Sequence, residues 1–415
     1  MNEKAGGLLS PINVIVLTVL VDMTGFGIII PLIPFYVQKL GSGPSGIGVL
    51  LASFSVMQLL FSPLLGRVSD SRGRRPVLLF SILTSIGSFA IFTLAESYLM
   101  LLLSRLIAGL ATEGAVAQAY VADITTEEER SKGIGMVGAA TGVGFILGPV
   151  LGGLLSPYGL RVPGYAAVLL GVLNLVFILF FLPEPERLRN AVEPRGLAES
   201  LSEVLDAVRA PLTGQVLTIF FVITLSFAAI PVIVPLLAID FYGFTEVEMS
   251  YVFIFIGLVQ VFLQGFAMSR LVRTLGEEKL IVFGPLLMLC GVLMMPMLRG
   301  LGFFGLSLVL VSVGVGLTNT SVPSFMSLMS PPDKQGGVLG VTQSVGSVAR
   351  IPGPLIGGVA VEFGGIGLPF YVSAFLLLIP FLLGCRVFRA CTIRGLLEPP
   401  SSRRRFPGGV DRPFH

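Results

Sequence analysis

The sequence predicts an all-α membrane protein with twelve transmembrane helices arranged in two pseudo-symmetric bundles of six. Three observations lead to this prediction: a low charge content, twelve long apolar segments and a motif that occurs once in each half. Of the 415 residues, 54% are hydrophobic and only 12% are charged, whereas a soluble domain carries about 25% charged residues. The composition therefore excludes a large water-soluble globule, and three cysteines are too few for a disulfide scaffold.

Twelve apolar segments are long enough to cross a bilayer, whose core of about 30 Å requires about 20 residues in helical form. The first six predicted spans are residues 11–36, 44–66, 76–95, 97–121, 133–155 and 164–183. The second six are residues 213–239, 249–270, 279–298, 303–329, 336–360 and 366–388. The first segment lacks a small-residue cleavage site and carries Asp22 near its middle, so we interpret it as a retained span rather than a signal peptide.

Lysine and arginine residues collect on one side of this predicted bundle. If the N-terminus is inside, the inner connections and the two tails hold 22 of the 27 basic residues, and the outer connections hold only Lys39, Arg161 and Arg299. Because basic residues favour the cytoplasmic side, we expect a multi-pass plasma-membrane protein with both termini in the cytoplasm. The net charge of +3 is too small to indicate nucleic-acid binding.

One long charged segment divides the spans into two groups. We expect residues 1–183 to form the N-terminal six-helix bundle and residues 213–388 the C-terminal one. Residues 184–212 would be a cytoplasmic linker, and residues 389–415 a basic cytoplasmic tail. Apolar residues at helical spacing between positions 197 and 208 predict an amphipathic surface helix within the linker.

The two halves carry the same motif at a nearly constant offset. Gly148-Pro149 and Gly152-Gly153 recur 205 positions later as Gly353-Pro354 and Gly357-Gly358. A proline in the first span of each half and a glycine after the second span match at offsets of 204 and 203. Parallel repeats of this kind place a substrate cavity between the halves near the bilayer midplane.

Four motifs resemble those of one family. Residues 66–75 read GRVSDSRGRR, similar to the pattern G-x-x-x-D-x-x-G-R-[KR], and Arg105 precedes Gly109 in the fourth span. Residues 144–153 read GFILGPVLGG, and the first span reads DMTGFG from Asp22. Together these motifs, spread over a chain of twelve spans, resemble the major facilitator superfamily. Those of the first and fifth spans resemble its drug–proton antiporters, including tetracycline and multidrug exporters.

The resemblance implies a secondary active transporter. We expect proton-coupled efflux (antiport) of lipophilic or cationic drug-like compounds by alternating access of the two halves. The alternative is a proton-coupled or facilitative transporter of a sugar, an organic acid or a lipid on the same fold. In either case we expect a monomer in the lipid bilayer that handles protons and a small-molecule substrate, without a cofactor or a metal ion.

The connection after the second span combines one acid with several arginines. A carboxylate at this place can cap a helix N-terminus or pair with Arg74. The resemblance implies a partner acid at the end of the fourth span and a latch that holds the halves together when the protein opens outward. The alternative is simple anchoring by basic residues. The predicted cytoplasmic gate comprises Gly66, Asp70, Gly73, Arg74, Arg75 and Asp123.

The fifth span places Gly144, Gly148 and Gly152 on one helical face, with Pro149 as a bend and Gly153 beside it. Small residues at this spacing let helices approach closely, so the motif predicts tight packing. A further role as a sealed seam that favours exchange over leak is compatible with that packing.

Four ionisable residues lie within the apolar segments, where such groups are rare and indicate function. At 1.5 Å per residue, Asp22 lies about 16 Å from the inner surface and Arg105 about 10 Å from the outer one, so the two could pair. Burial favours a neutral carboxyl group and a nearby arginine favours the carboxylate, which is the balance that proton coupling requires. We expect Asp22 and Glu113 to couple protons with Arg105 as their charge partner. A structural ion pair for Asp22 and a cation-selecting role for Glu113 remain alternatives, and the role of Arg350 stays open.

The second half has no intramembrane carboxylate, but it offers neutral polar and aromatic side chains. Ligand pockets are mostly apolar with a few polar anchors. The predicted substrate cavity therefore comprises Phe227, Gln260, Gln264, Asn319 and Arg350.

Other classes of protein fit the sequence less well. The only histidine is His415, so neither a metal-dependent nor a Ser-His-Asp active site is predicted, and we expect no enzyme. A phosphate-binding G-x-x-x-x-G-K-[ST] loop is missing, which argues against a primary pump. A channel remains an alternative function, but it does not explain the duplicated motifs.

Overall fold

The computed structural model describes residues 10–111, 113–185, 209–329 and 335–393. Within these ranges the regular structure is entirely helical, and twelve segments are long and apolar enough to cross a membrane. The prediction of an all-α protein with twelve spans is confirmed. The predicted amphipathic helix of the linker lies outside the described residues, as does most of the predicted basic tail.

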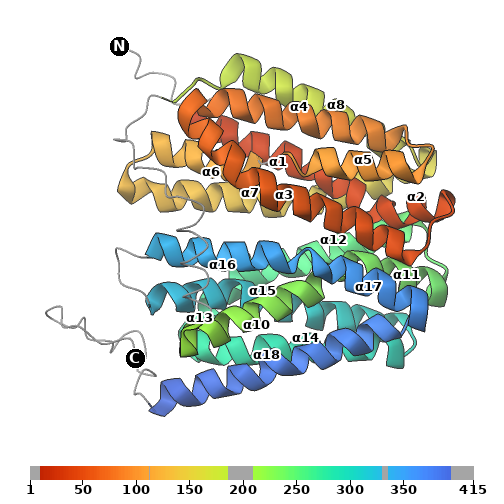
Figure 1. Cartoon of the computed structure of the whole chain (residues 1–415), viewed down its shortest axis with the longest axis vertical. Helices are drawn as coiled ribbons and strands as arrows, with labels where there is room; N and C mark the ends of the chain where they lie inside the picture. The colour runs from red at the N-terminus through yellow and green to blue at the C-terminus, as the bar shows by residue number, and fades with distance from the viewer. Residues whose placement is uncertain (1–9, 112, 186–208, 330–334, 394–415) are drawn as a thin grey trace, which may run out of the picture.

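Figure 1 shows the first-half helices together above the second-half helices, with the helix axes roughly parallel to one another. The first half contains α1 (Pro11–Ile29), η1 (Ile30–Leu32), α2 (Ile33–Lys39), α3 (Pro44–Arg72), α4 (Arg74–Thr93), α5 (Tyr98–Ala108), α6 (Glu113–Ile124), α7 (Glu127–Leu155), η2 (Ser156–Tyr158) and α8 (Val162–Phe181). The second half contains α10 (Pro211–Ala228), α11 (Ile230–Tyr242), α12 (Glu246–Phe262), the π-helical turn η3 (Leu263–Ala267), α13 (Met268–Leu275), α14 (Glu277–Met297), α15 (Leu301–Leu328), α16 (Gln335–Ala349), α17 (Pro352–Gly364) and α18 (Leu368–Ile393).

Several spans are interrupted part-way through the bundle. The first span changes from α-helix to a 3₁₀ turn at Pro31. The seventh span breaks between α10 and α11, just before Pro231. Proline lacks an N–H group and its ring clashes with the preceding turn, so helices break or kink there. The fourth span, expected to be one continuous helix, is instead α5 and α6 separated after Gly109.

The connection between the second and third spans differs from the expected loop. Helix α3 continues to Arg72, and α4 begins at Arg74, so most of the 66–75 motif is helical. Only Gly73 interrupts the two helices, at a φ of 105° that favours glycine. We call the end of the bundle that carries this motif the motif end.

The halves share one apolar core only at the end opposite to the motif end. The largest buried cluster joins both halves, for example Ile28 and Leu50 with Ile233 and Leu236. Nearer the motif end, each half has its own separate cluster, one around Val77 and Tyr120 and the other around residues 216–220. The halves are therefore closed together at one end and have separate cores at the other.

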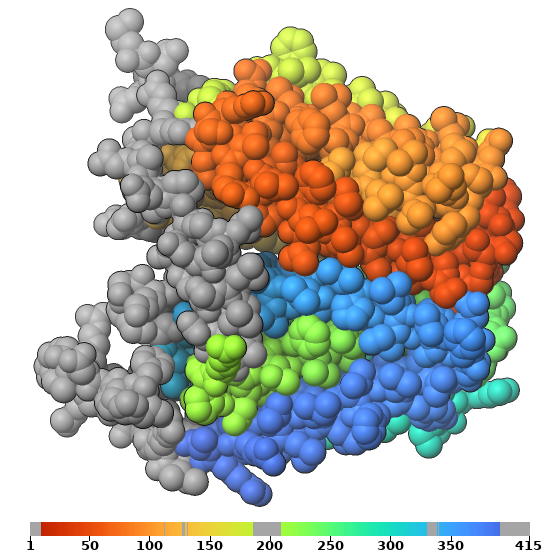
Figure 2. Space-filling model, in the orientation of Figure 1, coloured from red at the N-terminus to blue at the C-terminus, as the bar shows by residue number. Residues whose placement is uncertain are grey.

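Close backbone contacts seal the shared end, where α3 packs on α17 and α7 packs on α12. Figure 2 shows the first of these contacts, where the surface of the first half meets that of α17. A Cβ atom on Gly358 would lie 2.5 Å from the carbonyl oxygen of Pro44, and one on Gly153 would lie 2.5 Å from the Cβ of Ser250. Gly153 and Gly358 are repeat equivalents at the offset of 205 residues. The two inter-half contacts are therefore themselves related by the duplication.

Candidate functional site

A cavity of about 820 Å³ lies between the two halves. Its walls come from α1, η1, α3, α6 and α7 of the first half and from α10, α11, α15, α16 and α17 of the second. Phe26 packs on Phe54 and Phe145 in the first-half wall, with ring centroids 5.1 and 5.8 Å apart. Phe220 and Phe227 contribute to the second-half wall. The polar lining residues are Ser55, Gln118, Thr224, Asn319, Thr342, Gln343 and Arg350. An apolar chamber with a few polar anchors is the usual form of a small-molecule site.

Three of the five predicted cavity residues line this chamber, namely Phe227, Asn319 and Arg350. Gln260 and Gln264 lie outside it. The Gln260 side chain donates a hydrogen bond of 2.9 Å to the Ser312 carbonyl oxygen, and Gln264 donates to Gln260 at 3.1 Å. Gln260 therefore links α12 to α15, whereas Gln264 is exposed and bonds only to Gln260 of its own span.

The two predicted proton-coupling carboxyl groups lie together inside the first half. Asp22 of α1 is 7% exposed and Glu113 of α6 is 3% exposed. The Ser85 hydroxyl of α4 donates to Glu113 at 3.1 Å, and Asp22 interacts with the same serine. The charges of the two acids also interact with each other. A serine has one hydroxyl proton, so it can donate to only one of two carboxylates.

Close helix packing brings these side chains together. Gly25 follows Asp22 by three residues, and a Cβ atom there would lie 2.9 Å from the Phe89 ring on α4. Glycine thus allows α1 to approach α4 at the level of the acids. The break after Gly109 places Glu113 in the first turn of α6, where the positive end of a helix dipole stabilises an acid.

Arg105 does not join this pair. Its buried guanidinium donates to the Ser88 and Ser104 hydroxyls at 3.3 and 3.4 Å and lies 5.1 Å from the centroid of the Phe92 ring. No ion pair between Asp22 and Arg105 occurs among the described residues. Ser88 is about one helical turn beyond Ser85 on α4, so Arg105 is held by serines farther from the motif end. The expected pairing with Asp22 is absent for this reason.

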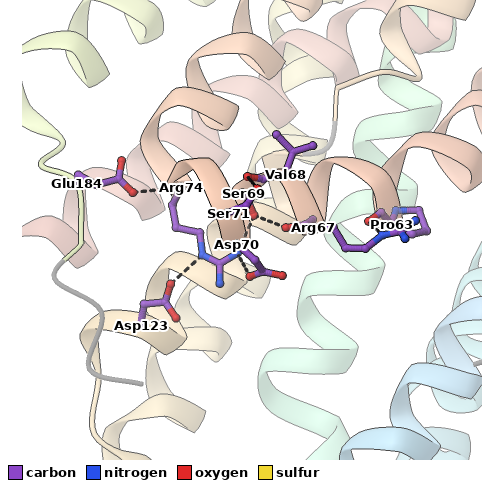
Figure 3. Close-up of polar contacts among 10 residues, drawn as sticks. Pro63, Arg67, Val68, Ser69, Asp70, Ser71, Arg74, Asp123 and Glu184 are labelled. Carbon is purple, nitrogen blue, oxygen red and sulfur yellow. Dashed lines mark hydrogen bonds and ion pairs between the residues drawn. The ribbon is translucent and has the colours of Figure 1, made fainter. Parts of the chain in front are cut away.

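At the motif end, Arg74 joins three elements of the first half (Figure 3). Its guanidinium pairs with Asp70 of α3 at 2.6 Å and with Asp123 of α6 at 2.7 Å. The same group donates to the Ser69 hydroxyl at 2.6 Å. The sequence left two contacts open for Asp70, a helix cap or a pair with Arg74, and the structure shows the pair with Arg74. All of these residues lie in one half, so the cluster stiffens that half in the observed conformation.

Glu184 provides the cap of α4, which the sequence did not indicate. Its two carboxylate oxygens accept hydrogen bonds of 2.6 and 3.0 Å from the backbone N–H groups of Arg74 and Arg75. A Cβ atom on Gly73 would lie 2.7 Å from this carboxylate. Gly73 is therefore required both by its backbone angle and by the space that Glu184 occupies.

The other two predicted gate residues differ in how firmly they are held. Arg75 donates to the Leu179 carbonyl oxygen at 2.6 Å. Gly66 has no close neighbour, because a Cβ atom there would meet no other atom within 4 Å.

The second half lacks an equivalent charge cluster among its described residues. Gly276 again has a positive φ, of 79°. Glu277 follows it, is buried and accepts a hydrogen bond of 3.1 Å from Ser324. Arg273, which replaces the motif aspartate, donates to the Ser269 carbonyl oxygen of its own helix.

The glycine motif of α7 packs directly on α1. A Cβ atom on Gly144 would lie 2.7 Å from the Met23 Cβ, and one on Gly148 would lie 2.5 Å from the Gly27 Cα. Gly152 meets Ile28 more loosely, at 3.3 Å. The Pro149 ring lies against Gly27. The seam therefore flanks the α1 segment that begins at Asp22.

The sequence did not identify Ser85 or several of the residues that line the cavity, among them Gln118. A signal for Ser85 exists, because Ser81, Ser85 and Ser88 form a polar stripe at helical spacing in an otherwise apolar span. Gln118 lies five residues after Glu113 and lines the cavity. No local pattern distinguishes it from a residue that packs between helices.

Comparison with known proteins gives consistent results. Residues 15–354 match the family model described as Major Facilitator Superfamily. The class E tetracycline resistance protein of Escherichia coli is 32% identical over 345 residues, which cover 81% of this chain and 84% of that protein. Multidrug resistance protein 2 of Bacillus subtilis is 28% identical over 371 residues, covering 87% and 91%. The solved structure of the human organic anion transporter MFSD10 (TETRAN) superposes with a TM-score of 0.67 at 26% identity, covering 90% of this chain and 98% of that one.

The fold, the duplicated glycine motif and the cavity between the halves agree with these matches. The matches cover 84% of the tetracycline resistance protein and 91% of the multidrug resistance protein, so the similarity extends over most of each relative. The chain therefore belongs to the major facilitator superfamily, as a multi-pass membrane transporter of small molecules rather than an enzyme.

Proposed function

We propose that this transporter exports lipophilic drug-like compounds in exchange for protons by alternating access of its two halves. The observation that supports proton coupling most directly is the buried pair of Asp22 and Glu113, which both interact with Ser85. Ionisable groups at membrane depth are costly and mark ion or proton pathways. The names of the tetracycline and multidrug resistance relatives support the efflux of drug-like compounds.

The pair has the chemistry of a proton site. Two buried carboxylates repel each other, and the single proton of Ser85 can satisfy only one of them. A proton bound to the acid that Ser85 does not satisfy removes the repulsion and lets that acid donate a hydrogen bond. Releasing that proton restores the repulsion. The protonated and the deprotonated pair therefore favour different packing of α1, α4 and α6.

The glycine seam provides a route from this pair to the rest of the molecule. Asp22 lies on α1, and Gly144 and Gly148 hold α7 against the same helix. Just beyond these glycines, the C-terminal end of α7 reaches the second half through the contact between Gly153 and Ser250. Phe26, one turn beyond Asp22, lines the cavity. A shift of α1 on proton binding would therefore act on both the cavity wall and the inter-half contact.

The motif end is assigned to the cytoplasm, with both termini there, because the basic residues collect at that end. The shared apolar core then lies at the outer end, as in a carrier that faces inward. We propose that residues 1–183 and 213–388 rock as two units joined by the linker 184–212. When they open outward, the Asp70–Arg74–Asp123 cluster closes on the second half as the cytoplasmic gate. We further propose a monomer in the plasma membrane.

The lining of the cavity favours a lipophilic substrate, but it gives no support to selection of cations by Glu113. That residue lies behind the wall and is not among the lining residues. A second candidate is the organic acid transporter of the alternative stated above. It is favoured by the cationic Arg350 in the lining and by the similarity to a human organic anion transporter.

The test is transport by the purified protein in liposomes. An imposed pH gradient should drive movement of tetracycline against its own concentration gradient in the wild type. Asp22→Asn should abolish this coupling, whereas Asp240→Asn, which removes an exposed carboxylate of α11, should leave it unchanged. Transport that ignored the pH gradient in the wild type would contradict the proposed exchange.

A further inference from the structure

We propose that Arg350 is the anion-binding group of the cavity, and that the substrate is an amphipathic compound that joins an aromatic ring to a carboxylate or sulfonate. This inference rests on the proposed function and specifies its substrate class. It departs from the cationic compounds expected from the sequence.

Arg350 is the one charged residue among the described residues that line the cavity. Every other lining group is aromatic, aliphatic or neutral and polar. Its guanidinium donates to the Ser347 hydroxyl at 3.1 Å, and none of the ion pairs between described residues includes it. A guanidinium has five N–H donors, so this one bond leaves most of its donor capacity unused among the described residues.

A purely structural role would provide a different environment. The arginine of a buried structural pair has a carboxylate partner, because leaving one charge uncompensated is strongly destabilising. Arg105 is buried instead, and two serines and the face of Phe92 surround its guanidinium. Arg350 has one serine, and its side chain is exposed to the cavity. The anchoring of the chain to the membrane surface does not explain it either, because it lies between α16 and α17 within a span.

The internal repeat shows where the two halves of the cavity differ. At the offset of 205 residues, Arg350 corresponds to Phe145, and both residues line the chamber. The same structural position therefore presents an aromatic ring from the first half and a cation from the second. Phe145 packs with Phe26, which packs with Phe54, so the aromatic surface is continuous on the first-half side.

This arrangement fits one class of ligand. A flat apolar ring can lie against the phenylalanines, where burial and ring contacts stabilise it. A carboxylate or sulfonate at the other end of the same molecule can accept two parallel N–H bonds from the guanidinium. A cationic substrate would meet Arg350 without any acid in the described lining to offset the repulsion.

The experiment compares three probes that share one ring: naphthalene-2-sulfonate, naphthalene-2-sulfonamide and 2-naphthylmethylammonium. Their binding to the detergent-purified protein is measured by isothermal titration calorimetry without any gradient. We expect the wild type to bind the sulfonate at least about tenfold more tightly than the neutral sulfonamide and to bind the ammonium most weakly. Arg350→Gln should remove the preference, and Arg350→Lys should keep a large part of it. Arg270→Gln, the same change at an exposed arginine of α13 outside the lining, serves as the matched control and should preserve the order of the three probes.

Thermal unfolding of each variant checks that it remains folded, and the Lys variant keeps the test valid if the Gln variant is unstable. A wild type with no preference for the sulfonate over the sulfonamide contradicts the inference, and weak binding of all three probes counts as such a result. A preference that survives in Arg350→Gln also contradicts it.

The outcomes for this inference and for the proposed function are separable. Binding at equilibrium needs no proton gradient, so anion selectivity through Arg350 stands if proton-driven transport fails. Conversely, proton-driven transport with no anion preference refutes the role of Arg350 and leaves the exchange mechanism intact.

Discussion

The substitution Gly148→Ala tests the seam between α1 and α7. The added Cβ would lie 2.5 Å from the Gly27 Cα and 2.6 Å from the Thr24 carbonyl oxygen. Ordinary carbon–carbon contacts are about 3.5–4.0 Å, so the two helices must separate by about 1 Å. Backbone atoms line the contact on the α1 side, and no flexible side chain can move aside to absorb the change.

The expected magnitude follows from a matched control in the same helix. A Cβ on Gly142 meets no atom within 4 Å, so Gly142→Ala changes helix propensity without a clash. Both substitutions gain about 1 kcal/mol of helix propensity, whereas overpacking costs about 1–3 kcal/mol. The free energy of unfolding of Gly148→Ala should therefore be about 1–3 kcal/mol below that of Gly142→Ala.

The assay is denaturation of the purified variants in mixed micelles by titration with sodium dodecyl sulfate, followed by transport measurements on both. We expect Gly148→Ala to lose proton-driven transport, because separation of α1 from α7 displaces the helix that carries Asp22. Gly142→Ala should behave like the wild type. Equal unfolding free energies for the two variants would refute the close packing on which the seam is based.

Three further predictions concern the cap, the gate and the charge moved. Removing the α4 cap with Glu184→Ala should lower the free energy of unfolding by about 1 kcal/mol, the usual value for a helix cap; no change in the same denaturant titration contradicts the capping role. Asp70→Asn should slow transport in liposomes while leaving the dissociation constant of the bound probe unchanged, and loss of binding would count against a gate. If one proton enters for each monovalent anion exported, two charges move, so an inside-negative potential of about 100 mV favours export by about 5 kcal/mol. A valinomycin–potassium potential should therefore accelerate export of naphthalene-2-sulfonate, and insensitivity to it would contradict that exchange.

The twelve spans and their grouping were predictable because hydropathy alone decides which segments can enter a bilayer. The contact between Asp70 and Arg74 was also accessible, since an acid and a base only four positions apart in one short connection can pair. The repeat offset likewise anticipated which glycines allow close helix approach. These features depend on local sequence or on the periodicity of a single helix.

Other features depend on tertiary packing and could not be deduced in the same way. The break after Gly109 arises where α5 crosses α3, since a Cβ there would lie 2.5 Å from the Phe54 carbonyl oxygen. That break redirects α6, so Glu113 meets Asp22 while Arg105 remains among serines. Gln260 carries the same polar signal as a cavity residue, but the rotation of its helix turns it toward Ser312. Depth along a helix was predictable, whereas the direction in which each side chain points required the neighbouring helices.

The most direct test of the central claim reverses the driving force. Liposomes containing the purified protein and an internal pH dye receive an outward gradient of substrate with no initial pH gradient. We predict that substrate efflux drives protons inward and acidifies the lumen in the wild type, that Asp22→Asn abolishes the acidification, and that Asp240→Asn preserves it. Substrate efflux without any proton movement in the wild type would contradict the claim that the Asp22–Glu113 pair couples protons to export.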